Sequence, residues 1–126
     1  MAWEQCGTVI MNRVQASDGE YARVSQDGNI RNILFQTGQF DCAQEMLGGS
    51  YNPQNIYNMN PTEVHYNIAD WAIAGNKLNE IGTCLWYMNP FQPSCPGIFP
   101  YNGSGSLHTR LGDHCFYRPT EQYKNT

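Results

Sequence analysis

Residues 106–118 read SLHTRLGDHCFYR, and this stretch decides the fold of the C-terminal half of the chain. Two β-prone segments, 106–111 and 114–118, flank the dipeptide Gly112-Asp113. A two-residue loop that begins with glycine is typical of a tight hairpin turn. We therefore predict two antiparallel strands that are joined at this dipeptide.

A third strand is expected just before this hairpin. The segment 83–88, TCLWYM, is rich in β-prone residues and lies between Gly82 and Pro90. Successive strand residues point to opposite faces, so one of Trp86 and Tyr87 is expected to face the core. The segment 89–105 carries four prolines and is expected to be a long ordered loop.

The N-terminal half is expected to be mainly helical. In residues 2–14, apolar side chains recur at helical spacing and no proline interrupts them. The segment 61–74 shows the same spacing, with Asn60 expected as N-cap, Pro61 in the first turn and Glu63 in a capping box. Helices that precede a hairpin indicate an α+β fold, in which N-terminal helices pack on a small antiparallel sheet.

The remaining segments are expected to be turns and loops, apart from a short helix at 29–36. The segment 16–28 contains two Asp-Gly steps, and each is a turn signal. A turn is expected at 38–40, and the segment 48–60 is expected to be loop because it is rich in Asn, Gly and Pro.

The composition excludes several classes of function. The net charge is −4 and no Lys/Arg cluster occurs, so nucleic acid is not an expected partner. No segment is long and apolar enough to cross a bilayer, and the first residues do not resemble a signal peptide. The 126 residues are expected to form one domain, 1–126.

The five cysteines form no C-x-x-C pair, and no histidine lies at zinc-finger spacing from two of them, so neither a metal nor another cofactor is expected. Two alternatives remain open for the cysteines. One is a single disulfide among Cys84, Cys95 and Cys115, and the other is that all five are reduced.

Four segments together resemble one known family. They are, in order, VIMNRV at 9–14, QF at 39–40, LWYMNP at 85–90 and DHCFYRP at 113–119. Their order and spacing resemble the bacterial cell-wall hydrolases of the spore cortex-lytic (CwlJ/SleB) type. The resemblance is closer to the CwlJ branch, in which LWY, a Cys-Pro pair and a hairpin ending in HCFYxPT follow one another. It covers nearly the whole chain.

The resemblance implies a domain that cleaves the peptidoglycan glycan strands of the spore cortex during germination, as a muramidase or a lytic transglycosylase. It implies a lysozyme-like catalytic logic, in which a Glu kept protonated by its surroundings acts as general acid on the glycosidic oxygen. It also implies a location in the spore coat or cortex region of an endospore-forming, sporulating bacterium. The implied partners are glycan strands and spore-coat proteins.

In that family the acid lies in a Glu-Ala-x-x-Glu-like stretch, shortly before the helix that ends in Asn-Arg-Val. The resemblance therefore implies that the acid precedes Met1 and that this domain lacks its N-terminal helix. Glu4 is the nearest carboxylate, and a first-turn Glu is favoured by the helix dipole, so we expect a structural role for it rather than that of a substitute acid. The alternative function is a non-catalytic peptidoglycan-binding or spore-coat protein.

The residues expected to bind substrate come from the segments that carry the resemblance. A polar or aromatic side chain on a turn or strand can line a sugar groove, whereas core packing is the commoner role of an aromatic residue. Arg13 is expected to form a salt bridge or to cap carbonyl groups. The candidates for substrate binding are Gln39, Phe40, Tyr87, His114 and Tyr117.

Overall fold

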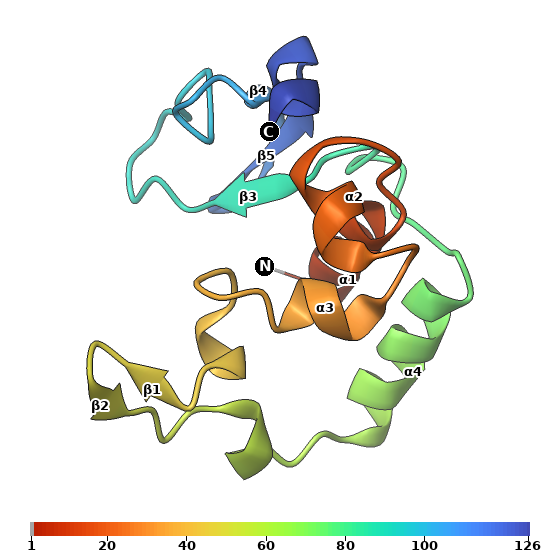
Figure 1. The fold of residues 1–126 in the computed structure, drawn as a ribbon, viewed down its shortest axis with the longest axis vertical. Helices are drawn as coiled ribbons and strands as arrows, with labels where there is room; N and C mark the ends of the chain where they lie inside the picture. Colours follow the sequence, from red (N-terminus) through yellow and green to blue (C-terminus); the bar gives the residue numbers. More distant parts are fainter. Residues whose placement is uncertain (1) are drawn as a thin grey trace.

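The computed structural model describes residues 2–126 and has helices followed by antiparallel strands, so the α+β prediction is confirmed. In Figure 1 the main sheet lies at the top, the helices in the middle and a small hairpin at the lower left. The helices are α1 (Trp3–Val14), α2 (Gly19–Ser25), α3 (Ile30–Leu34) and α4 (Glu63–Ile73), with short 3-10 turns η1 (Asp41–Ala43), η2 (Ile56–Asn58) and η3 (Glu121–Asn125).

The main sheet has three antiparallel strands in the order β3-β5-β4. They are β3 (Trp86–Met88), β4 (Gly105–Leu111) and β5 (His114–Pro119). Leu111 pairs with His114, which confirms the predicted hairpin at Gly112-Asp113. The predicted strand at 83–88 forms only in its last three residues. Just before it, the carbonyl oxygens of Cys84 and Leu85 are bonded to side chains of α1.

Asn12 and Arg13 hold this lead-in segment on α1. The Asn12 amide Nδ2 donates to the carbonyl oxygens of Gly82 and Cys84, at 2.9 Å each. Its Oδ1 accepts a hydrogen bond of 2.7 Å from Lys77. Arg13 Nε donates to the Leu85 carbonyl at 2.7 Å. These bonds fix where β3 begins relative to the end of α1.

The core between helices and sheet is aromatic. Trp86 is buried between Tyr21 and Tyr123, with ring centroids 6.2 Å and 5.5 Å away. A disulfide between Cys95 and Cys115 fastens the long loop to β5, which is one of the two alternatives that the cysteine pattern left open. The loop at 89–105 is therefore held on the sheet although it forms no strand.

Helix α2 lies in the segment 16–28, where the sequence predicted only loop, and that prediction is wrong. The helix forms because residues from the other end of the chain satisfy its first backbone N–H groups. Tyr123 Oη accepts from the Tyr21 N–H at 3.1 Å and donates to the Asp18 carbonyl at 2.9 Å. Thr126 Oγ1 accepts from the Glu20 N–H at 2.8 Å. The sequence around α2 cannot predict this cap, because the residue that supplies it lies 102 positions away in the chain.

Two further predictions need correction. The 61–74 helix begins at Glu63 instead of Pro61, with Thr62 as N-cap in place of Asn60. His65 Nδ1, and not a Glu63 carboxylate, accepts from the Thr62 N–H, at 2.9 Å. In the segment expected to be loop at 48–60, two glycines with positive φ turn the chain, so that strands β1 (Met46–Leu47) and β2 (Ser50–Tyr51) pair.

Replacing Tyr123 by phenylalanine is expected to lower the free energy of unfolding by about 1–3 kcal/mol, because the buried Tyr21 N–H then loses its acceptor. The measurement is urea denaturation, together with hydrogen exchange of the Tyr21 amide, which should become faster. Tyr101→Phe is the matched control, since the Tyr101 side chain is exposed. Equal stability of the two variants would contradict the capping role.

Candidate functional site

A groove of about 440 Å³ lies between helix α2, the turn at 38–40, strand β3 and the long loop. Gln39 and Tyr87, two of the five predicted residues, both line it. A larger hollow of about 680 Å³ is lined by α1, α2 and the segment that joins α2 to α3, and it contains none of the predicted residues and no arginine or aromatic side chain. We therefore take the smaller groove as the candidate site.

Arg13 forms the charged part of this groove. Its Nη1 donates to Gln39 Oε1 at 3.2 Å, and Tyr21 Oη donates to the same oxygen at 3.4 Å. The guanidinium carbon lies 4.7 Å from the centre of the Tyr21 ring and 5.4 Å from that of the Phe40 ring. The guanidinium is therefore held in one place by a carbonyl, an amide oxygen and two aromatic faces.

The expected salt bridge of Arg13 does not occur in the described part of the chain. The ion pair found among residues 2–126 joins Lys124 and Glu121, which are both exposed. Arg13 was also expected to cap carbonyl groups, and it does bond one. That carbonyl belongs to Leu85, in the segment that leads into β3. Arg13 is only 5% exposed, so its charge is buried, and none of the carboxylates among residues 2–126 pairs with it.

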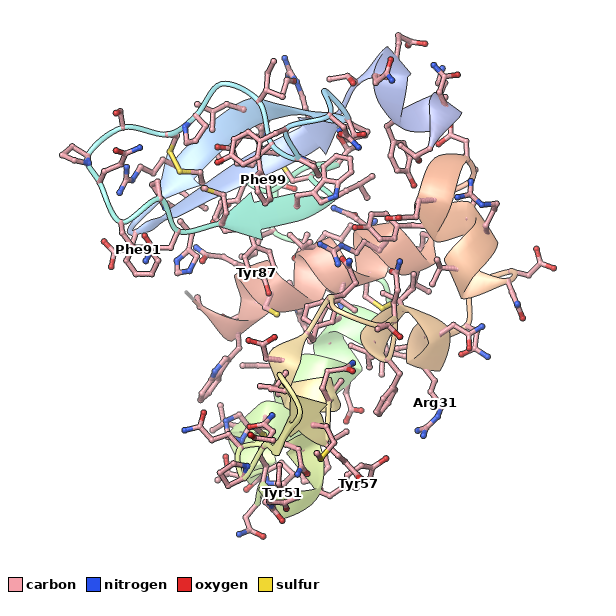
Figure 2. The ribbon with its side chains drawn as sticks, turned by 60° about the vertical axis from the view of Figure 1, so that its left-hand side comes forward. Arg31, Tyr51, Tyr57, Tyr87, Phe91 and Phe99 are labelled. Carbon is pink, nitrogen blue, oxygen red and sulfur yellow. A yellow bond between two sulfur atoms is a disulfide. The ribbon has the colours of Figure 1, made fainter. Side chains whose placement is uncertain are left out.

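Tyr87 extends from β3 toward α1, as Figure 2 shows. Its hydroxyl lies 3.9 Å from the Cys6 sulfur, and its side chain is half-buried, whereas that of Trp86 is buried. Burial raises the pKa of the Tyr87 hydroxyl and also that of Tyr21. Both hydroxyls are therefore protonated at neutral pH. The Tyr87 hydroxyl can donate a hydrogen bond to a ligand, whereas the Tyr21 hydroxyl already donates to Gln39.

The other predicted residues are placed differently. Phe40 packs on the Arg13 guanidinium and does not line the groove. His114 lies beside Tyr87, with ring centroids 6.2 Å apart, outside the groove lining, and burial lowers the pKa of its imidazole. Tyr117 is fully buried, and its hydroxyl donates to the Pro96 carbonyl at 2.7 Å. The Tyr117 side chain therefore has a structural role and is not free to contact a substrate.

The carboxylate side chain that lines the groove is that of Glu20, at the start of α2. Glu4 lies in the first turn of α1 and is not among the lining residues. No cluster of three His, Cys, Asp or Glu side chains suited to a metal ion occurs in the chain from residue 2 onward. The groove offers hydroxyl, amide and guanidinium donors together with aromatic surface.

Sequence reasoning missed several residues of the groove. Tyr21 and Glu20 come from the helix that was expected to be loop, and Tyr123 reaches the groove by capping that helix. Asn102 and Ser104 lie in the proline-rich loop, and nothing in their local pattern points to a site. Arg13 lies in the recognisable sequence Asn-Arg-Val, but a structural role was expected for it and not a place in the site.

Comparisons with known proteins identify the family of the chain. The family model for cell wall hydrolases matches residues 4–117, a range that includes Arg13, Gln39 and Tyr87. No curated protein and no solved structure gives a significant match to the chain. Each helix among residues 2–126 is too short or too polar to span a lipid bilayer. Because the match covers most of its length, the chain belongs to the cell wall hydrolase family.

Proposed function

We propose that the groove binds the glycan strand of peptidoglycan and that the domain cleaves this strand in the spore cortex during germination. Membership of the cell wall hydrolase family supports peptidoglycan as the substrate. The resemblance to the CwlJ branch is the basis for the cortex, for germination and for a location at the spore coat or cortex. The observation that carries the proposal is a groove in which Arg13, Gln39 and Tyr87 come together within the matched region.

The lining of the groove suits a sugar chain. A pyranose ring has apolar C–H faces and a rim of hydroxyl and amide groups, so its site needs aromatic surface next to hydrogen-bonding groups. Tyr87 and Phe99 supply the aromatic surface, and Gln39, Asn102 and Ser104 supply amide and hydroxyl groups. Because Gln39 Oε1 is already bonded by Arg13 and Tyr21, the Gln39 amide is held with its N–H groups available for a ligand.

The general acid is the second part of the proposal. Cleavage needs a carboxylic acid that stays protonated near neutral pH in an apolar surrounding. By resemblance, we assign this acid to the helix that precedes α1 in other members of the family. Glu4 is the candidate within the chain itself, at the second residue of α1.

Product analysis tests the proposed reaction. Purified spore cortex is digested with the 126-residue chain and, in parallel, with the protein encoded by its complete gene, and soluble fragments are analysed by mass spectrometry. Fragments with anhydro ends indicate lytic transglycosylation, and fragments with reducing ends indicate hydrolysis. The proposal expects one of these from the complete protein. Binding of cortex without release of any fragment by either protein would support the non-catalytic alternative instead.

The variant Glu4→Gln separates the two sources of the acid. If a preceding helix supplies the acid, Glu4→Gln in the complete protein keeps its activity. If this substitution abolishes the activity, Glu4 is the acid and our assignment is wrong.

Replacing Tyr87 by leucine is expected to weaken the binding of peptidoglycan glycan fragments about tenfold, because aromatic surface and a hydroxyl donor are lost together. Tyr87→Phe keeps the ring and should lose only part of the affinity. Tyr57→Leu is the matched control, since Tyr57 is exposed and lies far from Tyr87 in Figure 2. The measurement is isothermal titration calorimetry, and equal affinities of Tyr87→Leu and Tyr57→Leu would exclude Tyr87 from the site.

A further inference from the structure

The charge of Arg13 is not balanced within the described part of the chain. Arg13 is 5% exposed, and removal of a guanidinium from water costs free energy unless a partner compensates it. Its Nε and Nη1 are bonded to Leu85 and Gln39, whereas Nη2 has no hydrogen-bond partner among residues 2–126. The partners that it has are neutral.

The groove already contains one carboxylate, but not as a partner of Arg13. Glu20 lines the same groove, and no ion pair joins the two side chains. Arg13 is instead fixed by the ring of Tyr21 on helix α2 and by that of Phe40 at the end of the 38–40 turn. A guanidinium that is held in place, lacks an anion and lines a groove is suited to bind a carboxylate from a ligand.

Ser104 gives an independent indication that a ligand belongs in the groove. Its side chain is 1% exposed and lines the groove, and its Oγ has no hydrogen-bond partner among residues 2–126. A buried hydroxyl without a partner is rare in folded proteins and calls for a bonding group that is missing from the chain. A polar ligand in the groove would supply that group.

We infer that Arg13 binds a carboxylate carried by the muramic acid residues of the glycan, and that the Ser104 hydroxyl bonds the same bound segment. This inference rests on the proposed function and adds a substrate class to it. The preferred ligand is an anionic glycan, not a neutral oligosaccharide of N-acetylglucosamine. Two groups of peptidoglycan supply this chemistry, namely the lactyl carboxylate where no peptide is attached and the carboxylates of the stem peptide.

The decisive experiment varies the ligand and leaves the protein unchanged. Three tetrasaccharides of the same sugar sequence are titrated into the protein by calorimetry. Their lactyl groups are free, amidated by ammonia, or linked to a stem peptide. At least one carboxylate-bearing form is expected to bind about tenfold tighter than the neutral amide, and this ratio should fall as salt is added. The tighter of the two anionic forms identifies the source of the carboxylate.

Equal binding of all three ligands, or binding of none, would overturn the inference. The cortex digestion tests the proposed function independently of these titrations. If the complete protein releases fragments but binds the three ligands equally, the carboxylate site is wrong and the function stands. If it distinguishes the ligands but releases no fragment, the carboxylate site stands and the cleavage is wrong.

Three variants extend the test to the protein. Arg13→Gln should abolish the preference for the anionic ligand, and Arg13→Lys should restore part of it. Ser104→Ala removes a buried hydroxyl that has no partner, so it should not lower the melting temperature, yet it should weaken glycan binding about threefold or more. If the Ser104→Ala protein binds glycan with unchanged affinity, Ser104 does not contact the ligand, because a serine with a purely structural role would give that result.

Discussion

Gly105→Ala is expected to lower the free energy of unfolding by about 3 kcal/mol, one of the two largest effects of a single substitution in this protein. A Cβ atom at this position would lie 2.1 Å from the Phe99 carbonyl oxygen and 2.8 Å from the Trp86 ring. The first of these contacts involves backbone, so the long loop would have to move away from β4. The hydrogen bond of 3.1 Å from the Phe99 N–H to the Gly105 carbonyl opposes that movement.

Gly97→Ala is the matched control for this prediction. Gly97 lies in the same loop, and a Cβ atom there would meet no other atom within 4 Å. Thermal and urea unfolding of the two variants should therefore differ widely, with Gly97→Ala close to the parent protein. If Gly105→Ala were as stable as Gly97→Ala, the close packing of the long loop on Trp86 would be wrong, and with it the position of Ser104.

Asn12→Ala is the second substitution with a large expected effect, a loss of about 2–4 kcal/mol in the free energy of unfolding. The carbonyl of Cys84 would lose a buried donor, that of Gly82 a partly buried one, and Lys77 would lose an acceptor. Because these bonds fix the segment that leads into β3, glycan binding at Tyr87 should also weaken. Urea denaturation measures the stability, and titration calorimetry measures the binding.

Asn125→Ala is the control for Asn12→Ala, since Asn125 is exposed near the end of η3. It should leave both the stability and the binding unchanged. An Asn12→Ala protein that unfolds at the same urea concentration as this control would show that the Asn12 bonds do not hold the segment before β3 on α1.

The hairpin and the first and fourth helices could be predicted because their signals are local. Gly112-Asp113 between β-prone segments and the apolar spacing of residues 3–14 each determine one element without help from elsewhere. Helix α2 could not be predicted in this way. Its N-terminus depends on hydroxyl groups of Tyr123 and Thr126, more than a hundred residues along the chain.

The candidate site was only partly predictable for the same reason. Gln39 and Tyr87 lie in segments with recognisable sequence, and the structure brings both to one groove. Tyr117 lies in an equally recognisable segment, but the strand alternation that leaves Tyr87 half-exposed pairs Tyr117 with Trp86 on the buried side. Arg13 was expected to form a salt bridge or to cap carbonyl groups. That none of the carboxylates among residues 2–126 pairs with it becomes visible only when α1, α2 and the 38–40 turn are assembled.

The central claim is that the groove beside Arg13, Gln39 and Tyr87 is where the glycan strand binds. The most direct test is a nuclear magnetic resonance titration of the isotopically labelled protein with a muramic acid-containing tetrasaccharide. The account predicts that the largest shifts occur at the Arg13 Nε–H, the Gln39 side-chain amide and the Tyr87 backbone amide. Shifts that cluster instead on the β1–β2 hairpin, or no shifts in the groove at saturation, would contradict it.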